Sequence, residues 1–356
     1  MLSALELQNY RNLSLRADLA PAANLIIATN GCGKSNLLES IFYTATGKSF
    51  RPMQNVTEII GPEEDFAKVQ VSLDDHSIEY ITSFDKRLVR KLTIDQKHKT
   101  HKQLRQLLQV VIFAPHDVNL VGGEPAVRRD DLDIFLGFYI DGYSELSLKY
   151  RKLVANRNAL LKQVRTQNAS LQELAYWTQQ VIEFGSMIHQ HREQLLTEIS
   201  PVLDQISQQL YKSFYHGFKA EYNPSPASGG DFGATLAKKF ASNLDKEIAV
   251  GQTLYGPHKD DYDFLVMDKP LRYMGSRGEQ RLAVLIWKLA MLELLSKTGQ
   301  ASLIMLIDDP MSELDAEHRE LCAKYLLASG IQFVLTAAEE KDVPSILKKE
   351  AHSISL

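Results

Sequence analysis

The stretch "NLIIATNGCGKSNLLES", residues 24–40, constrains the fold more than any other part of the chain. An apolar run, a turn with two glycines and a segment with apolar residues at helical spacing predict a strand, a turn and a helix. Unpaired backbone N–H groups and the positive end of the helix dipole converge at such a turn, so it binds phosphate. We therefore expect a nucleotide site at Asn30, Gly31, Cys32, Gly33, Lys34, Ser35 and Asn36.

The turn departs from the full phosphate-loop pattern, G-x-x-x-x-G-K-[ST], at one position. Ala28 stands where the first glycine belongs, whereas Gly33, Lys34 and Ser35 follow the pattern. Alanine fits there if its φ is negative, because a positive φ would strain it. An ordinary strand-to-helix turn with a chance lysine is the alternative interpretation.

A second apolar run, "ASLIMLIDD", predicts a buried strand that ends in two acids. Asp308 is placed to hold Mg²⁺ together with Ser35, usually through water, and Asp309 to orient an attacking water. Two aspartates at a strand end can also be a turn or a helix cap. The phosphate loop earlier in the chain makes the catalytic interpretation of Lys34, Asp308 and Asp309 specific.

The segment "MGSRGEQR" predicts the start of a helix, with Ser276 as its cap. The order of phosphate loop, helical insertion, Ser-x-Gly-x-Gln helix start and acid pair resembles that of ABC-type ATPases. In such proteins the serine and glycine of one subunit cap the γ-phosphate that another subunit holds. The resemblance implies that Ser276, Gly278 and Gln280 contact ATP in a homodimer that forms on ATP.

Composition points to a folded, soluble protein. The chain has 356 residues, of which 44% are hydrophobic and 24% charged, and its only cysteines are Cys32 and Cys322. The N-terminus lacks the apolar core of a signal peptide and no apolar run is long enough for a membrane span, so we expect a cytoplasmic location and no membrane partner.

Charge is unevenly distributed along the chain. The net charge of −4 argues against a protein that coats nucleic acid over its whole surface. Residues 86–105 nevertheless contain eight lysines and arginines against one acid. This segment is either a solvated hairpin face or a DNA-backbone contact, in which Lys86, Arg87, Arg90 and Lys91 are the candidate DNA-binding residues.

The predicted elements divide the chain into two lobes. Alternating short apolar runs predict a mixed α/β lobe with an antiparallel meander, residues 1–112 and 297–356, which binds ATP. Long helical patterns predict a mainly helical lobe, residues 113–296. This lobe carries the segment "MGSRGEQR", residues 274–281, which we call the signature segment. We expect the Gly/Pro-bearing segment "HDVNLVGGEPAVRR" to be a loop.

Several motifs together, in order along nearly the whole chain, resemble the RecF family of DNA-repair proteins: "LELQNYRNL", "GKSFR", "NRNALLK", "YGPHKDD", "GSRGEQR" and "DDPMSELD". The resemblance implies an ABC-type P-loop NTPase head that binds ATP and Mg²⁺ and hydrolyses ATP slowly. It also implies binding to double-stranded and gapped or junction DNA, and partnership with RecR and RecO in loading recombinase. Arg11 resembles a nucleotide-contacting residue, and Asp315 belongs to the dimer-facing loop.

Departures from the family pattern leave alternatives open. Glu279 adds a carboxylate to the signature segment, His116 stands where an acid is usual, and Thr336 occupies the switch position where transporters carry histidine. His258 is either a structural residue or a catalytic one. The rival functions are a nucleotide-binding adaptor with little hydrolysis and the ATPase subunit of a transporter, against which "YGPHKDD" counts.

Overall fold

The computed structural model describes residues 1–210, 217–299, 301–309 and 316–356, which form two compact units. Unit 1 comprises the described residues within Met1–Val118, Ile206–Ser213 and Ser276–Leu356, and unit 2 those within Asn119–Gln205 and Phe214–Gly275. No helix in the described ranges is long and apolar enough to cross a membrane.

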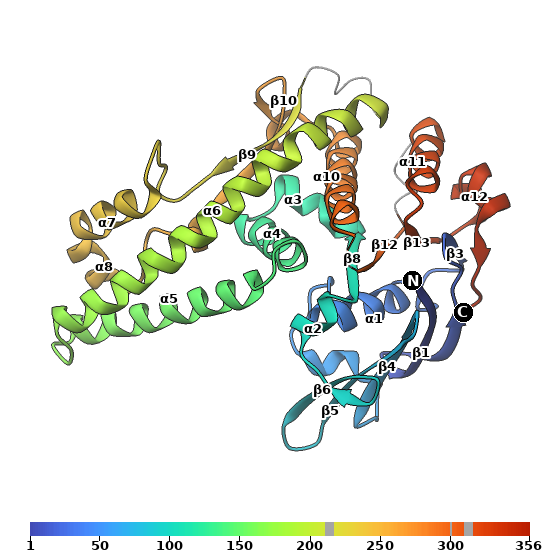
Figure 1. The fold of residues 1–356 in the computed structure, drawn as a ribbon, viewed down its shortest axis with the longest axis horizontal. Coiled ribbons are helices and arrows are strands. Elements are labelled where there is room, and N and C mark those ends of the chain that lie inside the picture. The colour runs from blue at the N-terminus through green and yellow to red at the C-terminus, as the bar shows by residue number, and fades with distance from the viewer. Residues whose placement is uncertain (211–216, 300, 310–315) are drawn as a thin grey trace. The chain divides into compact units, whose positions relative to one another are not determined.

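A parallel five-stranded sheet lies in unit 1, in the order β14-β3-β13-β12-β8 (Figure 1). Its strands are β3 (Ala23–Ile27), β8 (Leu108–Phe113), β12 (Ser302–Ile307), β13 (Gln332–Ala337) and β14 (His352–Ser353). All residues of β8 and β13 are buried. Such continuous burial is typical of a parallel sheet that is covered on both faces.

The same unit contains an antiparallel six-stranded sheet in the order β2-β1-β4-β5-β6-β7. Its strands are β1 (Leu2–Tyr10), β2 (Leu13–Asp18), β4 (Phe66–Leu73), β5 (His76–Phe84), β6 (Leu88–Ile94) and β7 (Lys97–His98). Strand β4 alternates between buried and half-buried residues along its whole length, as expected for a sheet with one face on the core. The predicted meander is confirmed.

Within the described residues, unit 1 also contains the helices α1 (Lys34–Thr46), α2 (His101–Arg105), α10 (Arg277–Thr298), α11 (Ala316–Ser329) and α12 (Ser345–Glu350), together with the end of α6 (Leu171–Leu210). Helix α10 is apolar on most sides and contacts β8 and β12. Its Trp287 is fully buried. Helix α10 therefore belongs to the core of unit 1, not to the helical lobe in which the sequence placed residues 276–296.

Unit 2 is mainly helical and also holds a small antiparallel sheet, β11-β10-β9. Its elements are α3 (Asn119–Gly122), α4 (Pro125–Tyr139), α5 (Tyr143–Arg165), most of α6 (Leu171–Leu210), β9 (Phe218–Asn223), α7 (Phe232–Ser242), α8 (Leu244–Val250), β10 (Asp261–Val266), β11 (Lys269–Pro270) and α9 (Leu271–Met274). Helices α5 and α6 lie side by side, joined by a hydrogen bond of 3.0 Å from Arg157 Nε to Thr178 Oγ1.

One predicted loop is wrong. The segment 116–129 contains a short 3₁₀ turn, helix α3 and the first turn of α4. Gly122 and Gly123 end α3, and Pro125 begins α4 at the first helical position, where its missing N–H is not needed. The glycines and the proline therefore separate two helices and do not mark a long loop.

Candidate nucleotide site

The candidate site lies at the carboxyl edge of the parallel sheet. The loop 28–33 follows β3, Asp308 follows β12, and Pro115 and His116 follow β8. Strand β13 lies between β3 and β12 and ends beside them, with Thr336 paired to Ile26. Since ligands of α/β sheets bind outside the carboxyl ends of the strands, this edge is the expected place for a nucleotide.

The loop 28–33 depends on its two glycines. Gly31 has a φ of 86° and Gly33 a φ of 108°, both in the left-handed region that L side chains rarely adopt. A Cβ at Gly33 would also lie 2.5 Å from Leu13 Cδ2. Ala28 is not among the residues with positive φ, so alanine fits at the first position without strain.

Lys34 begins helix α1 and its side chain folds over the loop. The ammonium Nζ donates hydrogen bonds to the carbonyl oxygens of Ala28 and Thr29, the latter at 3.0 Å, and lies 3.5 Å from Asn30 Oδ1. A positive charge therefore lies at the N-terminus of α1, where the helix dipole also favours an anion. Half-buried Cys32 packs in the same loop.

Asp308 joins the ends of three neighbouring elements. Its Oδ1 accepts a hydrogen bond of 3.0 Å from Ser35 Oγ on α1 and one of 2.9 Å from Thr336 Oγ1 on β13. Thr336 Oγ1 in turn accepts a hydrogen bond of 3.0 Å from the backbone N–H of Asp309. The structure thus brings together the loop serine, the acid pair and the residue at the switch position.

Asp309 has a backbone φ of 46°, an uncommon conformation for a residue other than glycine. Burial and the neighbouring Asp308 carboxylate raise its pKa above the ordinary value of an aspartate, although Lys34 and Arg281 partly oppose the shift. Perturbed carboxylates in a polar site are functional candidates.

A second polar cluster surrounds Glu39, a fully buried carboxylate on α1. Arg11 Nη2 donates to Glu39 Oε1 at 2.8 Å, and Arg51 Nη2 donates to Glu39 Oε2 at 2.8 Å. Ser49 Oγ also donates to Glu39, and Arg51 donates to Asn36 Oδ1. Arg11, Asn36 and Arg51 are therefore fixed around one buried acid.

Arg11 and Arg51 also line a cavity of about 540 Å³ that reaches Asp308. Phe50 and His116 line it too, and their rings stack with centroids 5.8 Å apart and nearly parallel planes. This volume lies in the range of small-molecule sites. The cavity therefore extends from the predicted Arg11 to Asp308.

The signature residues lie at the start of α10. Ser276 Oγ accepts a hydrogen bond of 3.3 Å from the backbone N–H of Glu279, and the Glu279 carboxylate accepts bonds from the Ser276 N–H and hydroxyl at 2.8 and 2.9 Å. This capping box turns Glu279 back onto its own helix start. In the described chain, the Ser276 side chain hydrogen-bonds only with Glu279, so the structure does not join it to the loop 28–33 of the same chain.

Gly278 and Gln280 share this helix start. A Cβ at Gly278 would meet no atom within 4 Å, so the surface beside Ser276 is open to an approaching group. The predicted dimer-facing Asp315 lies outside the described residues.

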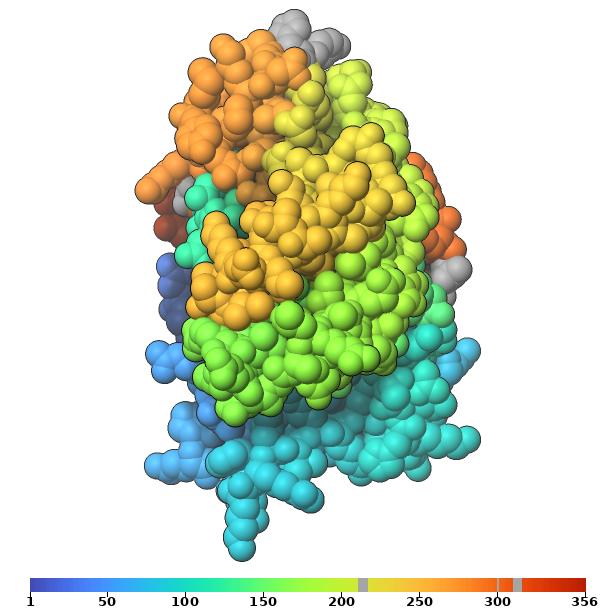
Figure 2. All heavy atoms as spheres, turned by 90° about the vertical axis from the view of Figure 1, so that its left-hand side faces the viewer, coloured from blue at the N-terminus to red at the C-terminus, as the bar shows by residue number. Residues whose placement is uncertain are grey.

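The candidate DNA-binding residues lie on the β5–β6 hairpin, which protrudes from the rest of its sheet (Figure 2). Every residue from Phe84 to Lys91 is exposed. Arg90 Nη1 lies 3.3 Å from the carbonyl oxygen of Gly47. The predicted cations therefore share a solvent-exposed ribbon.

His258 in "YGPHKDD" lies in unit 2, and both of its ring nitrogens are occupied. Its Nε2 lies 3.0 Å from the carbonyl oxygen of Thr253 and therefore donates, so that Nδ1 accepts the hydroxyl hydrogen of Tyr150 at 2.9 Å. Burial lowers the pKa of His258 to about 4. A neutral ring with no free nitrogen favours the structural role over the catalytic one.

Comparison with known proteins gives the family. The protein family described as "RecF/RecN/SMC N terminal domain" matches residues 1–350 of this chain. The DNA replication and repair protein RecF of Carboxydothermus hydrogenoformans is 32% identical over 342 residues, which cover 95% of this chain and 94% of that protein. RecF of Bacillus thuringiensis is 32% identical over 373 residues, which cover 99% and 96%. The chain belongs to the RecF family.

Solved structures agree with this RecF assignment. The recombination mediator protein RecF-ATPrS in the RecFOR pathway matches with a TM-score of 0.87 and 25% identity, over 100% of this chain and 96% of that one. An Smc head bound to the C-terminal winged-helix domain of ScpA matches with a TM-score of 0.52 and 13% identity, over 95% and 90%, which shows a shared fold. The predicted ABC-type head is confirmed.

Sequence reasoning about this RecF-family chain assigned no role to Glu39 or Arg51. The available signal was a charged residue on the apolar face of a predicted helix, between Leu38 and Ile41. Carboxylates are rarely buried unless they are paired. A buried glutamate so close to a phosphate loop therefore predicts arginine partners, of which "GKSFR" and "NYRN" supply one each.

Glu39 makes the stability of the protein depend on pH. Burial alone raises its pKa, but hydrogen bonds from Arg11, Arg51 and Ser49 lower it on balance below the usual glutamate value of 4.5. The stabilisation is therefore fully present above about pH 4.5 and is lost as the pH falls through the folded-state pKa. Glu39→Gln should lower the free energy of unfolding by about 3 kcal/mol at pH 7, a difference that shrinks below pH 4.5.

Urea denaturation of both proteins between pH 3 and 7 measures this difference. Glu6→Gln is the control, because Glu6 is exposed on β1 of the same unit, and it should change stability little at any pH. Parallel stability curves for the wild type and Glu39→Gln would contradict the prediction.

Proposed function

We propose that this chain is an ATP-dependent DNA-binding protein of recombinational repair that closes into a dimer on ATP. The observation that carries the proposal is that Ser35 and Thr336 both donate a hydrogen bond to Asp308 at one edge of the sheet, in a member of the RecF family. A relative's solved structure is named RecF-ATP, in the RecFOR pathway.

Residues 30–36, from the loop 28–33 into the first turn of α1, would hold the phosphates of ATP, with backbone N–H groups and Lys34 as donors. Ser35 and Asp308 offer a hydroxyl and a carboxylate oxygen 3.0 Å apart, the hard oxygen ligands that Mg²⁺ prefers when phosphates and water complete its shell. Bound Mg²⁺ would neutralise phosphate charge. Asp309 would accept a hydrogen bond from the attacking water, and Lys34 and Arg11 would offset the phosphate charge.

The signature residues Ser276, Gly278 and Gln280 would cap the nucleotide of a second copy. The open space at Gly278 supports this role, since a partner's phosphate needs close approach to the backbone there. The capping box holds the Glu279 carboxylate against Ser276, so this negative charge need not face the phosphates of the partner's nucleotide. ATP would then act as the link between two protomers.

The exposed β5–β6 hairpin would contact the DNA backbone through Lys86, Arg87, Arg90 and Lys91. Contacts of this kind depend on phosphate charge, so binding is insensitive to sequence and weakens with salt. By family membership we further expect gapped and junction DNA as substrate, RecR- and RecO-like partners, a role in loading recombinase at single-strand gaps, and a cytoplasmic location.

The second candidate function is a nucleotide-binding adaptor that recruits a partner with little hydrolysis. The hydrogen bonds between Ser276 and Glu279 favour this candidate, because they occupy the serine hydroxyl that would otherwise cap a partner's phosphate. Both candidates share nucleotide binding, so turnover separates them.

ATP turnover should require Asp309. Asp309→Asn removes the carboxylate but keeps the size of the side chain, and should lower the turnover rate by a factor on the order of 10²–10⁴ while ATP still binds. Phosphate release with and without duplex DNA measures the rate. Glu340→Gln, at an exposed acid after β13, is the control. Equal low rates in the wild type and Asp309→Asn would favour the adaptor.

Dimerisation should depend on ATP and on the signature. Light scattering with Mg²⁺ and ATP should show a dimer that is absent with ADP and without nucleotide. Lys34→Ala should prevent it through loss of ATP binding, and Ser276→Arg through a clash at the cap. Ser296→Arg, near the other end of the same helix, should leave it intact. A monomer under all conditions with ATP still bound would rule out the ATP-linked dimer.

DNA affinity should depend on the hairpin. Reversal of three charges, Arg87→Glu, Arg90→Glu and Lys91→Glu, should weaken duplex binding. The dependence of log affinity on log salt should become less steep by about one for each phosphate that the variant no longer binds. Reversal of Lys238, Lys239 and Lys246 on α7 and α8 is a control with the same charge change. Unchanged duplex affinity in the hairpin variant would exclude the hairpin.

A further inference from the structure

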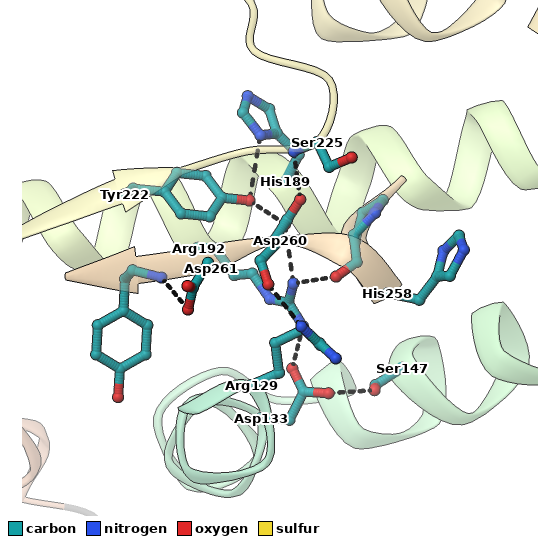
Figure 3. Close-up of polar contacts among 12 residues, drawn as sticks. Arg129, Asp133, Ser147, His189, Arg192, Tyr222, Ser225, His258, Asp260 and Asp261 are labelled. Carbon is teal, nitrogen blue, oxygen red and sulfur yellow. Dashed lines mark hydrogen bonds and ion pairs between the residues drawn. The ribbon is translucent and has the colours of Figure 1, made fainter. Parts of the chain in front are cut away.

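A cavity of about 240 Å³ lies wholly within unit 2, apart from the candidate nucleotide site. Its wall includes Arg129 on α4, Tyr150 and Arg151 on α5, Arg192 on α6, and His258. Figure 3 shows Arg129 and Arg192 beside Asp133 and Asp260. The cavity is smaller than the roughly 300–1,000 Å³ of typical small-molecule sites, so it has room for a small group and not for a whole nucleotide.

Asp133, one of the acids that line the cavity, is already satisfied. Asp133 Oδ1 accepts from Tyr143 Oη at 2.6 Å and from Arg192 Nη2 at 2.8 Å, and Oδ2 accepts from Arg151 Nη2 at 2.9 Å and from Ser147 Oγ at 3.0 Å. The positive charge of Arg192, together with the hydrogen bonds from Arg192, Tyr143 and Arg151, holds the pKa of Asp133 at about 2 against the effect of burial. Asp133 therefore stays ionised, and each of its two oxygens already accepts two hydrogen bonds.

Asp260 is satisfied in the same way on the other side of Arg192. Its Oδ2 accepts from Arg192 Nη1 at 2.9 Å and from the Tyr222 hydroxyl, and its Oδ1 accepts from the backbone N–H of Ser225 at 2.7 Å. Arg192 thus bridges two acids and is itself buried. This network fixes the cavity wall without supplying a spare carboxylate.

Arg129 is the exception among these charged groups. Across the described residues its guanidinium makes one hydrogen bond, from Nη1 to the carbonyl oxygen of Asp260 at 2.7 Å, and no ion pair. A guanidinium has five donors in a planar fork. Burial and the positive charge of Arg192 lower the pKa of Arg129, and the carboxylates of Asp260, Asp261 and Asp130 only partly oppose this shift.

The remaining wall offers guanidinium donors beside one further acid. Asp130 also lines the cavity, and its Oδ1 accepts a hydrogen bond of 3.3 Å from Arg151 Nη2. Arg151 is half exposed and uses only Nη2 in its contacts with Asp130 and Asp133, which leaves Nε and Nη1 available. Tyr150 and His258 are hydrogen-bonded to each other, and burial lowers the pKa of His258 to about 4, so its ring is neutral. The unused donors at the cavity are therefore those of the guanidinium groups.

We propose that this cavity binds one tetrahedral oxyanion, a phosphate group, through the unused donors of Arg129 and Arg151. Paired guanidinium donors match the geometry of phosphate oxygens, and such charge-assisted bonds are the strong ones. The group could be free phosphate or a backbone phosphate of DNA, which carry the same oxygens. The site does not depend on the proposed ATP-driven dimer.

The test uses the full chain with Lys34→Ala, which removes the lysine of the other expected phosphate site. Calorimetric titration with inorganic phosphate should show one saturable site. Adding Arg129→Gln should weaken binding about tenfold or more, and Arg129→Lys should give an intermediate affinity because it keeps the charge and loses the fork. Arg165→Gln is the matched control, since Arg165 also makes a single hydrogen bond to a carbonyl, at 3.1 Å from Ala249.

Circular dichroism and the melting temperature without phosphate establish whether each variant folds. If Arg129→Gln does not fold, Arg151→Gln, at a half-exposed position, repeats the test. A second readout is direct: crystals soaked in tungstate should show anomalous scattering inside the cavity. The absence of a saturable site, equal affinity in Arg129→Gln, or no tungstate at the cavity would each overturn the proposal.

A competition experiment with DNA identifies the source of the phosphate group. If a short duplex displaces phosphate and Arg129→Gln reduces the salt slope of DNA binding by about one, the group is a backbone phosphate. If phosphate binds and duplex does not displace it, the ligand is a free ion. Either result supports the site, and neither depends on whether ATP drives dimerisation.

Discussion

The hydrogen bonds of Asp308 to Ser35 and Thr336 hold together the parts on which the candidate site depends. Asp308 follows β12, Thr336 belongs to β13, and Ser35 lies at the start of α1, the helix that follows β3. Because the carboxyl ends of parallel strands meet at one edge, residues that are 273 positions apart in the sequence come within 3.0 Å. The two glycines of the loop serve the same arrangement, since only a left-handed backbone lets α1 begin where Lys34 can reach the loop carbonyls.

Buried ionic clusters occur in both units. In unit 1, Glu39 is surrounded by Arg11 and Arg51. In unit 2, Arg192 bridges Asp133 and Asp260. Burying such charges is unfavourable unless each is paired and hydrogen-bonded, and both clusters meet this condition. Among the described residues, Arg129 beside the second cluster forms no ion pair with a carboxylate, and this contrast is the basis of the proposed phosphate site.

Much of the fold could be predicted from local patterns. The helix at residues 34–46 and the strands of the meander follow from apolar spacing, and Lys34, Ser35 and the acid pair follow from motif position. The helices in 116–129 could not be predicted from the same signals, because glycine and proline also delimit short helices. The place of α10 in unit 1 depends on the burial of nearly every residue from Leu282 to Leu295, which periodicity does not reveal.

By itself, the sequence determined the phosphate loop, the acid pair, the signature segment and the RecF-type order of motifs, since each is a short pattern whose chemistry depends on residues a few positions apart. The tertiary structure decided which distant groups meet: Thr336 with both aspartates, Arg11 and Arg51 on Glu39, Glu279 turned back onto Ser276, and His258 occupied on both nitrogens. The physical reason is that hydrogen bonds and burial act over a few ångströms in space, and only the folded chain sets those distances.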